Sequence, residues 1–92
     1  MSEARRSLTV VNQRGLHARA SAKFVTAVAE LDNGTSVRVA KGANEAAGGS
    51  ILGLMMLGAA KGDTIEVIVT GDDREAVLAK LCAIVEDGFG ED

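Results

Sequence analysis

Residues 12–31 read NQRGLHARASAKFVTAVAEL, a polar turn that leads into an amphipathic segment. Phe24, Val28 and Leu31 recur at helical spacing, so a helix with one buried face is expected from about His17 to Leu31. His17, the only histidine of the chain, falls where the turn meets the helix, and Arg19 follows two residues later. The first N–H groups of a helix are unpaired and its dipole favours negative charge, so this junction is suited to hold an anion.

The rest of the chain alternates between short β-type and helical patterns. Alternating or β-branched residues predict strands at 8–11, 35–40, 45–47 and 64–70. Helices are expected at 50–56 and after Asp72, which resembles an N-cap with Glu75 three residues on, and residues 90–92 are expected to form a loose tail. The order strand, helix, strand, strand, helix, strand, helix predicts one α+β domain, 1–92, with helices covering the apolar face of a sheet.

Composition excludes several classes of function. The 92 residues carry a net charge of −3, and Phe24 and Phe89 are the only aromatic residues, which argues against nucleic acid as a partner. Cys82 is the only cysteine, so no disulfide framework or zinc site is expected, and no metal or cofactor is predicted. The polar start at 1–7 and the lack of a long apolar run predict no membrane insertion and a cytoplasmic location.

His17 is the candidate nucleophile. A neutral imidazole, which is abundant at neutral pH, has a lone pair that can attack phosphorus without a separate general base. Arg19 and the helix N-terminus would disfavour an imidazolium and would stabilise a phosphoryl dianion. The simpler alternative is an ordinary first-turn histidine that makes only local hydrogen bonds.

Residues 50–57, SILGLMML, form the second unusual segment, because every residue after Ser50 is apolar or glycine. Leu54 and Leu57 can share one helical face, while Ile51, Leu52 and Met55 spread toward another. In a small two-layer domain this second face would be exposed and could receive a partner, or the helix could simply be buried. Ser50 suits the N-cap, and a phosphate there would disturb an adjacent apolar interface.

Together, Gly15-Leu16-His17-Ala18-Arg19 and Ser50-Ile51-Leu52-Gly53-Leu54-Met55 resemble, in order and separation, the HPr family of histidine-containing phosphocarrier proteins. This family belongs to the bacterial phosphoenolpyruvate-dependent sugar phosphotransferase system. The resemblance covers nearly the whole chain and implies an open-faced two-layer sandwich. In that fold a four-stranded antiparallel sheet is covered on one face by three helices, in the order βαββαβα.

The resemblance also implies roles for individual residues. His17 would accept a phosphoryl group on Nδ1 from enzyme I and pass it to enzyme IIA-type proteins, and Arg19 would contact that group. Ser50 matches the regulatory serine that an HPr kinase/phosphorylase modifies in part of the family. A monomer with transient partners is expected. The partner-binding surface would comprise Ala18, Ala22, Thr26, Ile51, Leu52 and Met55.

Three positions depart from the family pattern. Ala20 stands where proline is usual, Arg14 where a small polar residue is usual, and Gly49 where lysine is common. Alternative functions are a regulatory phospho-switch of an incomplete phosphotransferase system, with little sugar transport, and a small ligand-binding domain with a coincidental histidine. The departures bear chiefly on the choice of partners.

Overall fold

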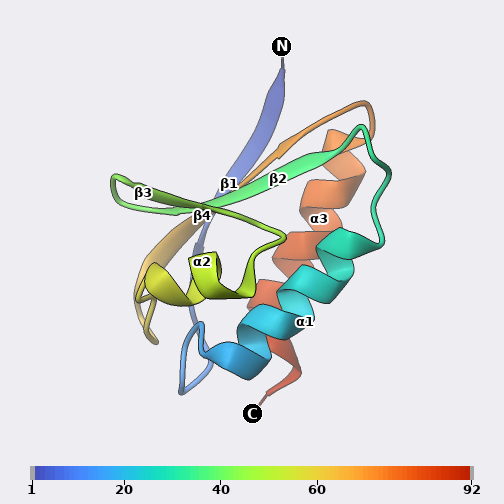
Figure 1. Cartoon of the computed structure of the whole chain (residues 1–92). Coiled ribbons are helices and arrows are strands. Elements are labelled where there is room, and N and C mark those ends of the chain that lie inside the picture. Colours follow the sequence, from blue (N-terminus) through green and yellow to red (C-terminus); the bar gives the residue numbers. More distant parts are fainter. Residues whose placement is uncertain (1, 92) are drawn as a thin grey trace.

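The computed structural model, which describes residues 2–91, places four antiparallel strands in one sheet. The spatial order is β1-β4-β2-β3, so β4 lies centrally between β1 and β2. The helices lie together on one face of the sheet (Figure 1). This arrangement confirms the predicted open-faced βαββαβα sandwich. The elements are β1 (Glu3–Thr9), α1 (Ala18–Ala29), β2 (Ser36–Lys41), β3 (Asn44–Ala47), α2 (Ile51–Met56), β4 (Thr64–Thr70), α3 (Arg74–Glu86) and the 3-10 turn η1 (Gly88–Gly90).

Strand alternation determines which sheet face the helices cover. In β4, Ile65, Val67 and Val69 are buried in the core that also contains Phe24 of α1 and Leu81 of α3. The opposite face carries charged residues. Ile68 lies on that face, yet it is only 1% exposed. Its cross-strand partners are Arg5 and Arg38, whose aliphatic stems can cover it while their charged ends remain in water.

Several predicted boundaries were wrong. Strand β2 is shifted by one residue from the predicted 35–40, and β3 begins one residue before the predicted 45–47. The first strand runs from Glu3 to Thr9 rather than over 8–11, because an edge strand with a solvated face can accommodate a largely polar sequence. Helix α1 ends at Ala29 instead of Leu31. Helix α3 begins at Arg74 with Asp73 at the N-cap, and no side chain caps it, so the proposed Asp72–Glu75 capping box does not form.

The predicted loose tail was also wrong over residues 90–91. Residues 88–90 form η1, and Phe89 is buried to 3% exposure against the core. Glu91 continues from η1 into contact with the turn before α1. Residue 92 lies outside the described residues. Residues 88–91 are thus anchored beside the N-terminus of α1 (Figure 1).

Candidate functional site

The turn before α1 is held by a glycine that tolerates no side chain. Gly15 has a φ of +62°, a region that favours glycine. A Cβ on Gly15 would lie 2.2 Å from the carbonyl oxygen of Ala59. The next residue, Leu16, donates its N–H to the same oxygen over 3.0 Å and buries its side chain. These contacts fix the backbone directly before His17.

His17 is the N-cap residue of α1. Its backbone is extended, its carbonyl accepts the first helical hydrogen bond from the Ser21 N–H at 2.9 Å, and its Nδ1 accepts the Arg19 N–H at 3.3 Å. An N-cap side chain normally satisfies one unpaired N–H of the first turn in this way. The prediction that His17 stands at the turn–helix junction is confirmed. The structure adds that its Nδ1 points at the N-terminus of the helix.

The other ring nitrogen meets a carboxylate. His17 Nε2 lies 2.7 Å from Oε2 of Glu91, and the two side chains are 17% and 21% exposed. Asn12, which is buried, donates from Nδ2 to Oε1 of Glu91 at 3.0 Å and to the carbonyl oxygen of Gly15 at 2.8 Å. The Asn12 hydrogen bond, followed by that of His17 and the charge of Arg19, lowers the pKa of the Glu91 carboxyl below its usual value. Glu91 is therefore an ionised acceptor.

Sequence reasoning missed both Glu91 and Asn12. The sequence predicts a loose tail at Glu91 and only a polar turn at Asn12. The one signal that could have located the segment is Phe89, an aromatic residue between two glycines near the end of a chain that has only two aromatics. A large apolar residue in a polar tail indicates an anchor in the core.

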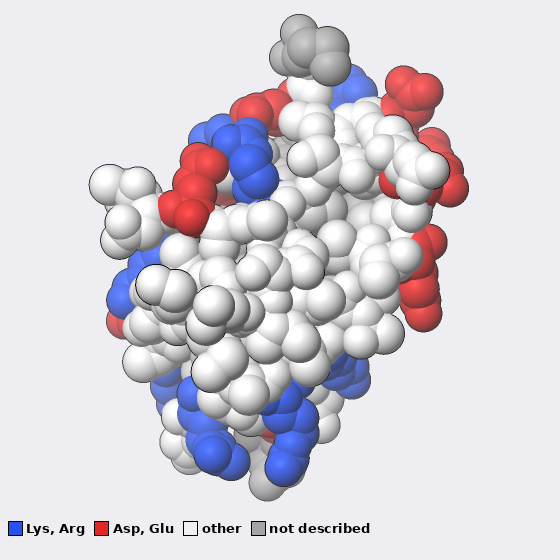
Figure 2. Space-filling model, in the orientation of Figure 1, with Lys and Arg blue, Asp and Glu red and all other residues white. Residues whose placement is uncertain are grey.

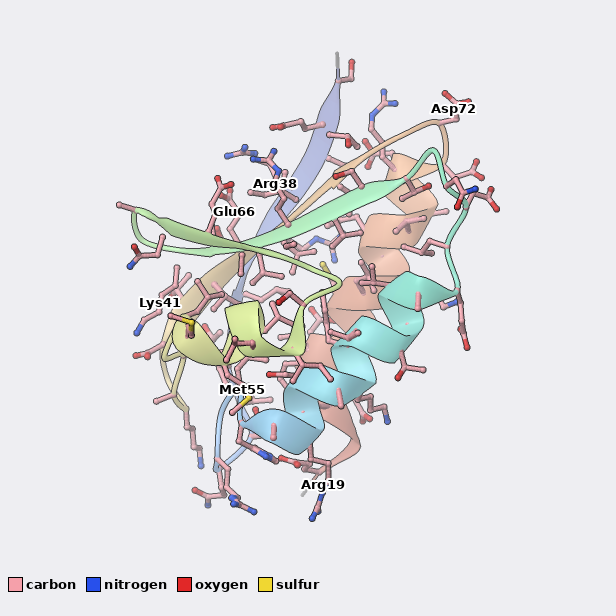
Figure 3. All side chains as sticks on the ribbon, viewed as in Figure 1. Arg19, Arg38, Lys41, Met55, Glu66 and Asp72 are labelled. Atoms are coloured by element: carbon pink, nitrogen blue, oxygen red, sulfur yellow. The ribbon has the colours of Figure 1, made fainter. Side chains whose placement is uncertain are left out.

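An open pocket of about 500 Å³ lies beside Arg19 and Glu91, the two residues that hydrogen-bond the His17 ring. Arg14, Arg19 and Lys23 line it together with Gln13, Phe89, Gly90 and Glu91. Figure 2 shows Lys and Arg side chains gathered at the lower end of the molecule, where Figure 3 places Arg19. The net charge of the chain is negative, so this local excess of positive charge favours an anion at the site. Arg14, one of the departures from the family pattern, contributes to it.

Helix α2 presents an apolar surface on the same side of the molecule. Leu54 and Leu57 are buried, whereas Ile51 and Met55 are each 40% exposed and Leu52 is 67% exposed, as predicted. Met56, at 77%, belongs to the same exposed set and was not predicted. Figure 3 shows Met55 extending toward the start of α1, and Figure 2 shows uncharged surface over α2. Of the other predicted contact residues, Ala18 and Thr26 are exposed and Ala22 is half-buried on α1.

Ser50 is the N-cap of α2. Its Oγ accepts the Gly53 N–H at 2.9 Å, and the residue is partly exposed. A Cβ on Gly53 would lie 3.1 Å from this Oγ, so glycine at the third helical position leaves room for the cap. The prediction of a serine N-cap is confirmed.

The described residues hold neither a metal-binding cluster nor a membrane-spanning helix. Within residues 2–91, no cluster of three His, Cys, Asp or Glu side chains is placed to bind a metal ion. Over the same residues, no helix is sufficiently long and apolar to cross a membrane.

A histidine at a helix N-cap, with a first-turn arginine and an exposed apolar helix face on the same side, is the arrangement expected of a small phosphoryl carrier. Residues 4–87 match the model of the family described as "PTS HPr component phosphorylation site". The chain belongs to this HPr family, and it is a phosphocarrier of the phosphotransferase system.

The chain aligns with similar proteins over nearly its full length and theirs. The chain is 36% identical to phosphocarrier protein NPr of Shewanella violacea, over 99% of this chain and 98% of that protein. It is 39% identical to phosphocarrier protein HPr of Neisseria meningitidis, over 95% and 96%. The crystal structure of HPr-C-His from Thermoanaerobacter tengcongensis superposes with a TM-score of 0.86 at 32% identity, covering 100% of this chain and 99% of that one.

Proposed function

We propose that His17 accepts a phosphoryl group on Nδ1 from enzyme I and donates it to enzyme IIA-type proteins. The observation that carries this proposal is the position of Nδ1 at the N-terminus of α1, where it accepts the Arg19 N–H. Arg19, which donates that N–H, also lines a pocket together with Arg14 and Lys23. An N-terminal helix end and three cations together favour the anion that the transfer delivers.

In the transfer, the Nδ1 lone pair forms a bond to phosphorus. The bond between phosphorus and the donor atom of enzyme I breaks, and its electron pair stays on that atom. The Arg19 N–H, no longer paired with Nδ1, then faces the phosphoryl oxygens, and the Arg19 guanidinium adds a charge-assisted contact. Donation to the next protein reverses these steps, so the same groups serve both directions of transfer.

Partners would dock over the exposed apolar surface of α2 and the adjoining residues of α1. Ile51, Leu52 and Met55 supply apolar area, Ala18 directly follows the histidine, and Thr26 is exposed further along α1. Small side chains beside His17 allow a partner to approach the phosphoryl group closely. A contiguous apolar surface of this kind, bordered by cations, suits recurrent, transient binding.

Ser50 is proposed as a second, regulatory phosphorylation site for an ATP-dependent HPr kinase/phosphorylase. Its hydroxyl is partly exposed and stands directly before the exposed Ile51 and Leu52. A phosphate at this position would place a dianion at the edge of the apolar docking surface and weaken the docking of partners. The position of Ser50 therefore supports control of docking and does not involve the chemistry at His17.

Labelling with phosphoenolpyruvate and enzyme I tests the carrier function. Wild-type protein should gain one phosphoryl group that is labile in acid and stable in base. His17→Ala should gain none, whereas Ser50→Ala should be labelled as the wild type is. An unlabelled wild type, or an undiminished label on His17→Ala, would refute the proposal. A label that reaches His17 but passes to no enzyme IIA-type protein would replace the carrier role with the regulatory phospho-switch.

A further inference from the structure

We propose that the C-terminal segment Gly88–Glu91 is a positioning element for the phosphoryl-accepting histidine, with the Glu91 carboxylate holding Nε2–H of His17. In this role Glu91 fixes the ring tautomer that leaves the Nδ1 lone pair free to attack. It also balances the positive charge that the ring gains when Nδ1 is phosphorylated. The inference rests on the proposed function of His17. The matched family model ends at residue 87, so this segment lies beyond it.

The backbone conformation of residues 88–90 brings the Glu91 side chain to the His17 ring. Gly88, Phe89 and Gly90 have φ values of +65°, +58° and +76°. A bulky residue such as phenylalanine rarely adopts a positive φ, and such strain persists only where surrounding contacts impose it. Here the contact is burial, because Phe89 is 3% exposed within the core. The anchored aromatic ring thus holds the chain in a turn that directs the next side chain but one, Glu91, at His17.

The glycines on either side allow the segment to lie close to its neighbours. A Cβ on Gly90 would lie 2.4 Å from Nζ of Lys23, so the Lys23 side chain crosses directly over this glycine. A Cβ on Gly88 would lie 3.5 Å from Cβ of Asn12. The segment therefore packs between α1 and the turn that precedes His17.

Two donors fix the Glu91 carboxylate. Oε1 accepts from Asn12 Nδ2, and Oε2 lies 2.7 Å from Nε2 of His17. The second Asn12 N–H bond, to the Gly15 carbonyl oxygen, joins this carboxylate to the turn that positions the histidine. The carboxylate orientation is thus set by the same turn that places the ring.

Both ring nitrogens specify the same tautomer. An ionised carboxylate can only accept a hydrogen bond, so Nε2 must carry the proton. At Nδ1 the partner is the Arg19 N–H, a donor, so Nδ1 must carry the lone pair. The two contacts therefore agree, and they leave the attacking atom at the helix N-terminus.

Glu91 also has an electrostatic role during transfer. When Nδ1 bonds to phosphorus and Nε2 keeps its proton, the ring carries one positive charge. The charged groups of the adjoining elements that line the neighbouring pocket are Arg14 of the turn, Arg19 and Lys23 of α1, and Glu91 of the C-terminal segment, whose carboxylate contacts the ring. Glu91 is the one acidic residue among the described residues that line this pocket. It can therefore stabilise the ring charge that makes the imidazole a good leaving group in the donation step.

The test compares Glu91→Gln with a matched control, Glu86→Gln, an exposed glutamate at the end of α3. The glutamine oxygen can accept from only one of the two donors and carries no charge. Single-turnover transfer from enzyme I should still reach Nδ1 in Glu91→Gln but should be roughly threefold to tenfold slower. This loss is far below that of a buried triad aspartate, because Glu91 is partly exposed and the Arg19 N–H still holds Nδ1. Glu86→Gln should transfer at the wild-type rate.

Two readouts separate positioning from a merely structural effect. Ring ¹⁵N shifts at about pH 8.5, where an ordinary imidazole is neutral, should report a larger Nδ1–H population in Glu91→Gln. The profile of phosphohistidine hydrolysis against pH should move to lower pH in Glu91→Gln, because protonation of the ring at Nε2 has lost its acceptor. Urea unfolding of each variant establishes that it is folded.

The outcomes distinguish this inference from the function on which it rests. If the wild type takes up no label, the carrier function itself fails. If the wild type is labelled while Glu91→Gln matches it in rate, tautomer population and hydrolysis profile, the positioning role is refuted. A rate loss shared equally by Glu86→Gln would attribute the effect to net charge and would likewise overturn the proposal.

Discussion

Replacing Gly15 by alanine should destabilise the protein well beyond the usual penalty for a left-handed residue. Gly15 and Gly42 have nearly the same φ, +62° and +60°. Either substitution places an alanine in the left-handed region, which costs about 1 kcal/mol. A Cβ at Gly42 meets nothing within 4 Å, whereas at Gly15 it would lie 2.2 Å from the Ala59 oxygen and 2.9 Å from Cα of Ala60. Both obstructing atoms are backbone, so the loop must move.

Comparing the two variants separates the cost of the steric overlap at Gly15 from the cost of a positive φ, which both positions share. Overpacking of this kind adds about 1–3 kcal/mol, so Gly15→Ala should lose about 2–4 kcal/mol and Gly42→Ala about 1 kcal/mol. The entropy that alanine removes from the unfolded chain is common to both and cancels in the comparison. A domain of 92 residues has a free energy of unfolding of about 5–14 kcal/mol, so both variants should fold.

Urea unfolding followed by far-ultraviolet circular dichroism measures the difference. The chain has no tryptophan or tyrosine, so the backbone signal is the appropriate probe. The m-values should agree among the wild type and both variants, since the surface exposed on unfolding is unchanged. A difference between the two variants of less than about 0.5 kcal/mol would refute the argument that the Ala59 contact fixes this turn. Phosphorylation of His17 should slow in Gly15→Ala alone, because only that turn carries the histidine.

Three further predictions concern Ser50, Leu52 and Cys82. Ser50→Ala removes the N-cap of α2 and should lower the free energy of unfolding by about 1 kcal/mol, measured by urea unfolding, whereas Ser50→Asp, which can still cap, should lose less. Leu52→Asp, at a side chain 67% exposed, should change stability by less than about 0.5 kcal/mol but weaken transfer from enzyme I roughly tenfold at low protein concentration. Burial raises the pKa of the Cys82 thiol above its ordinary value of 9.0, so alkylation of native protein should be slow at pH 8 to about 9. Because the unfolded thiol ionises first, stability should fall as pH rises above 9.0.

Much of the fold could be predicted from residue patterns. Strand β4 has the predicted bounds because its β-branched residues alternate between the core and the open face. Strand β1 was misplaced, since Glu3, Arg5 and Ser7 face solvent and only Ala4 and Leu8 are buried. Two buried residues in seven give too weak a pattern to distinguish an edge strand from a polar loop. The strand is defined by its pairing with β4, a tertiary contact that the local sequence pattern does not show.

Some residues of the candidate site can be predicted from the local sequence, whereas others depend on contacts between distant segments. His17 and Arg19 could be predicted because an N-cap histidine and a first-turn cation are local features of one segment. Glu91 could not, because 74 positions separate it from His17 and the contact depends on how η1 turns. Glycines usually mark flexible tails, but here Gly88 and Gly90 permit a tight turn around the buried Phe89. Composition alone does not distinguish these two uses.

The two proposed phosphorylation sites share one structural principle and differ in their surroundings. At each, the atom that would receive the phosphoryl group is the atom that caps a helix: Nδ1 of His17 accepts the Arg19 N–H, and Oγ of Ser50 accepts the Gly53 N–H. Phosphorylation at either place exchanges a capping bond of about 1 kcal/mol for an anion that the helix N-terminus favours.

The residues around each capping atom then determine the effect of phosphorylation. At His17 the proposed anion would lie next to Arg19, near the pocket that Lys23 also lines, and these cations would hold it away from the exposed apolar side chains of α2. At Ser50 the next residues are Ile51 and Leu52, both exposed and apolar, so a dianion there would oppose burial of that surface by a partner. The same chemical group is thus suited to transfer at the first site and to inhibition at the second, because cations surround one helix start and apolar side chains follow the other.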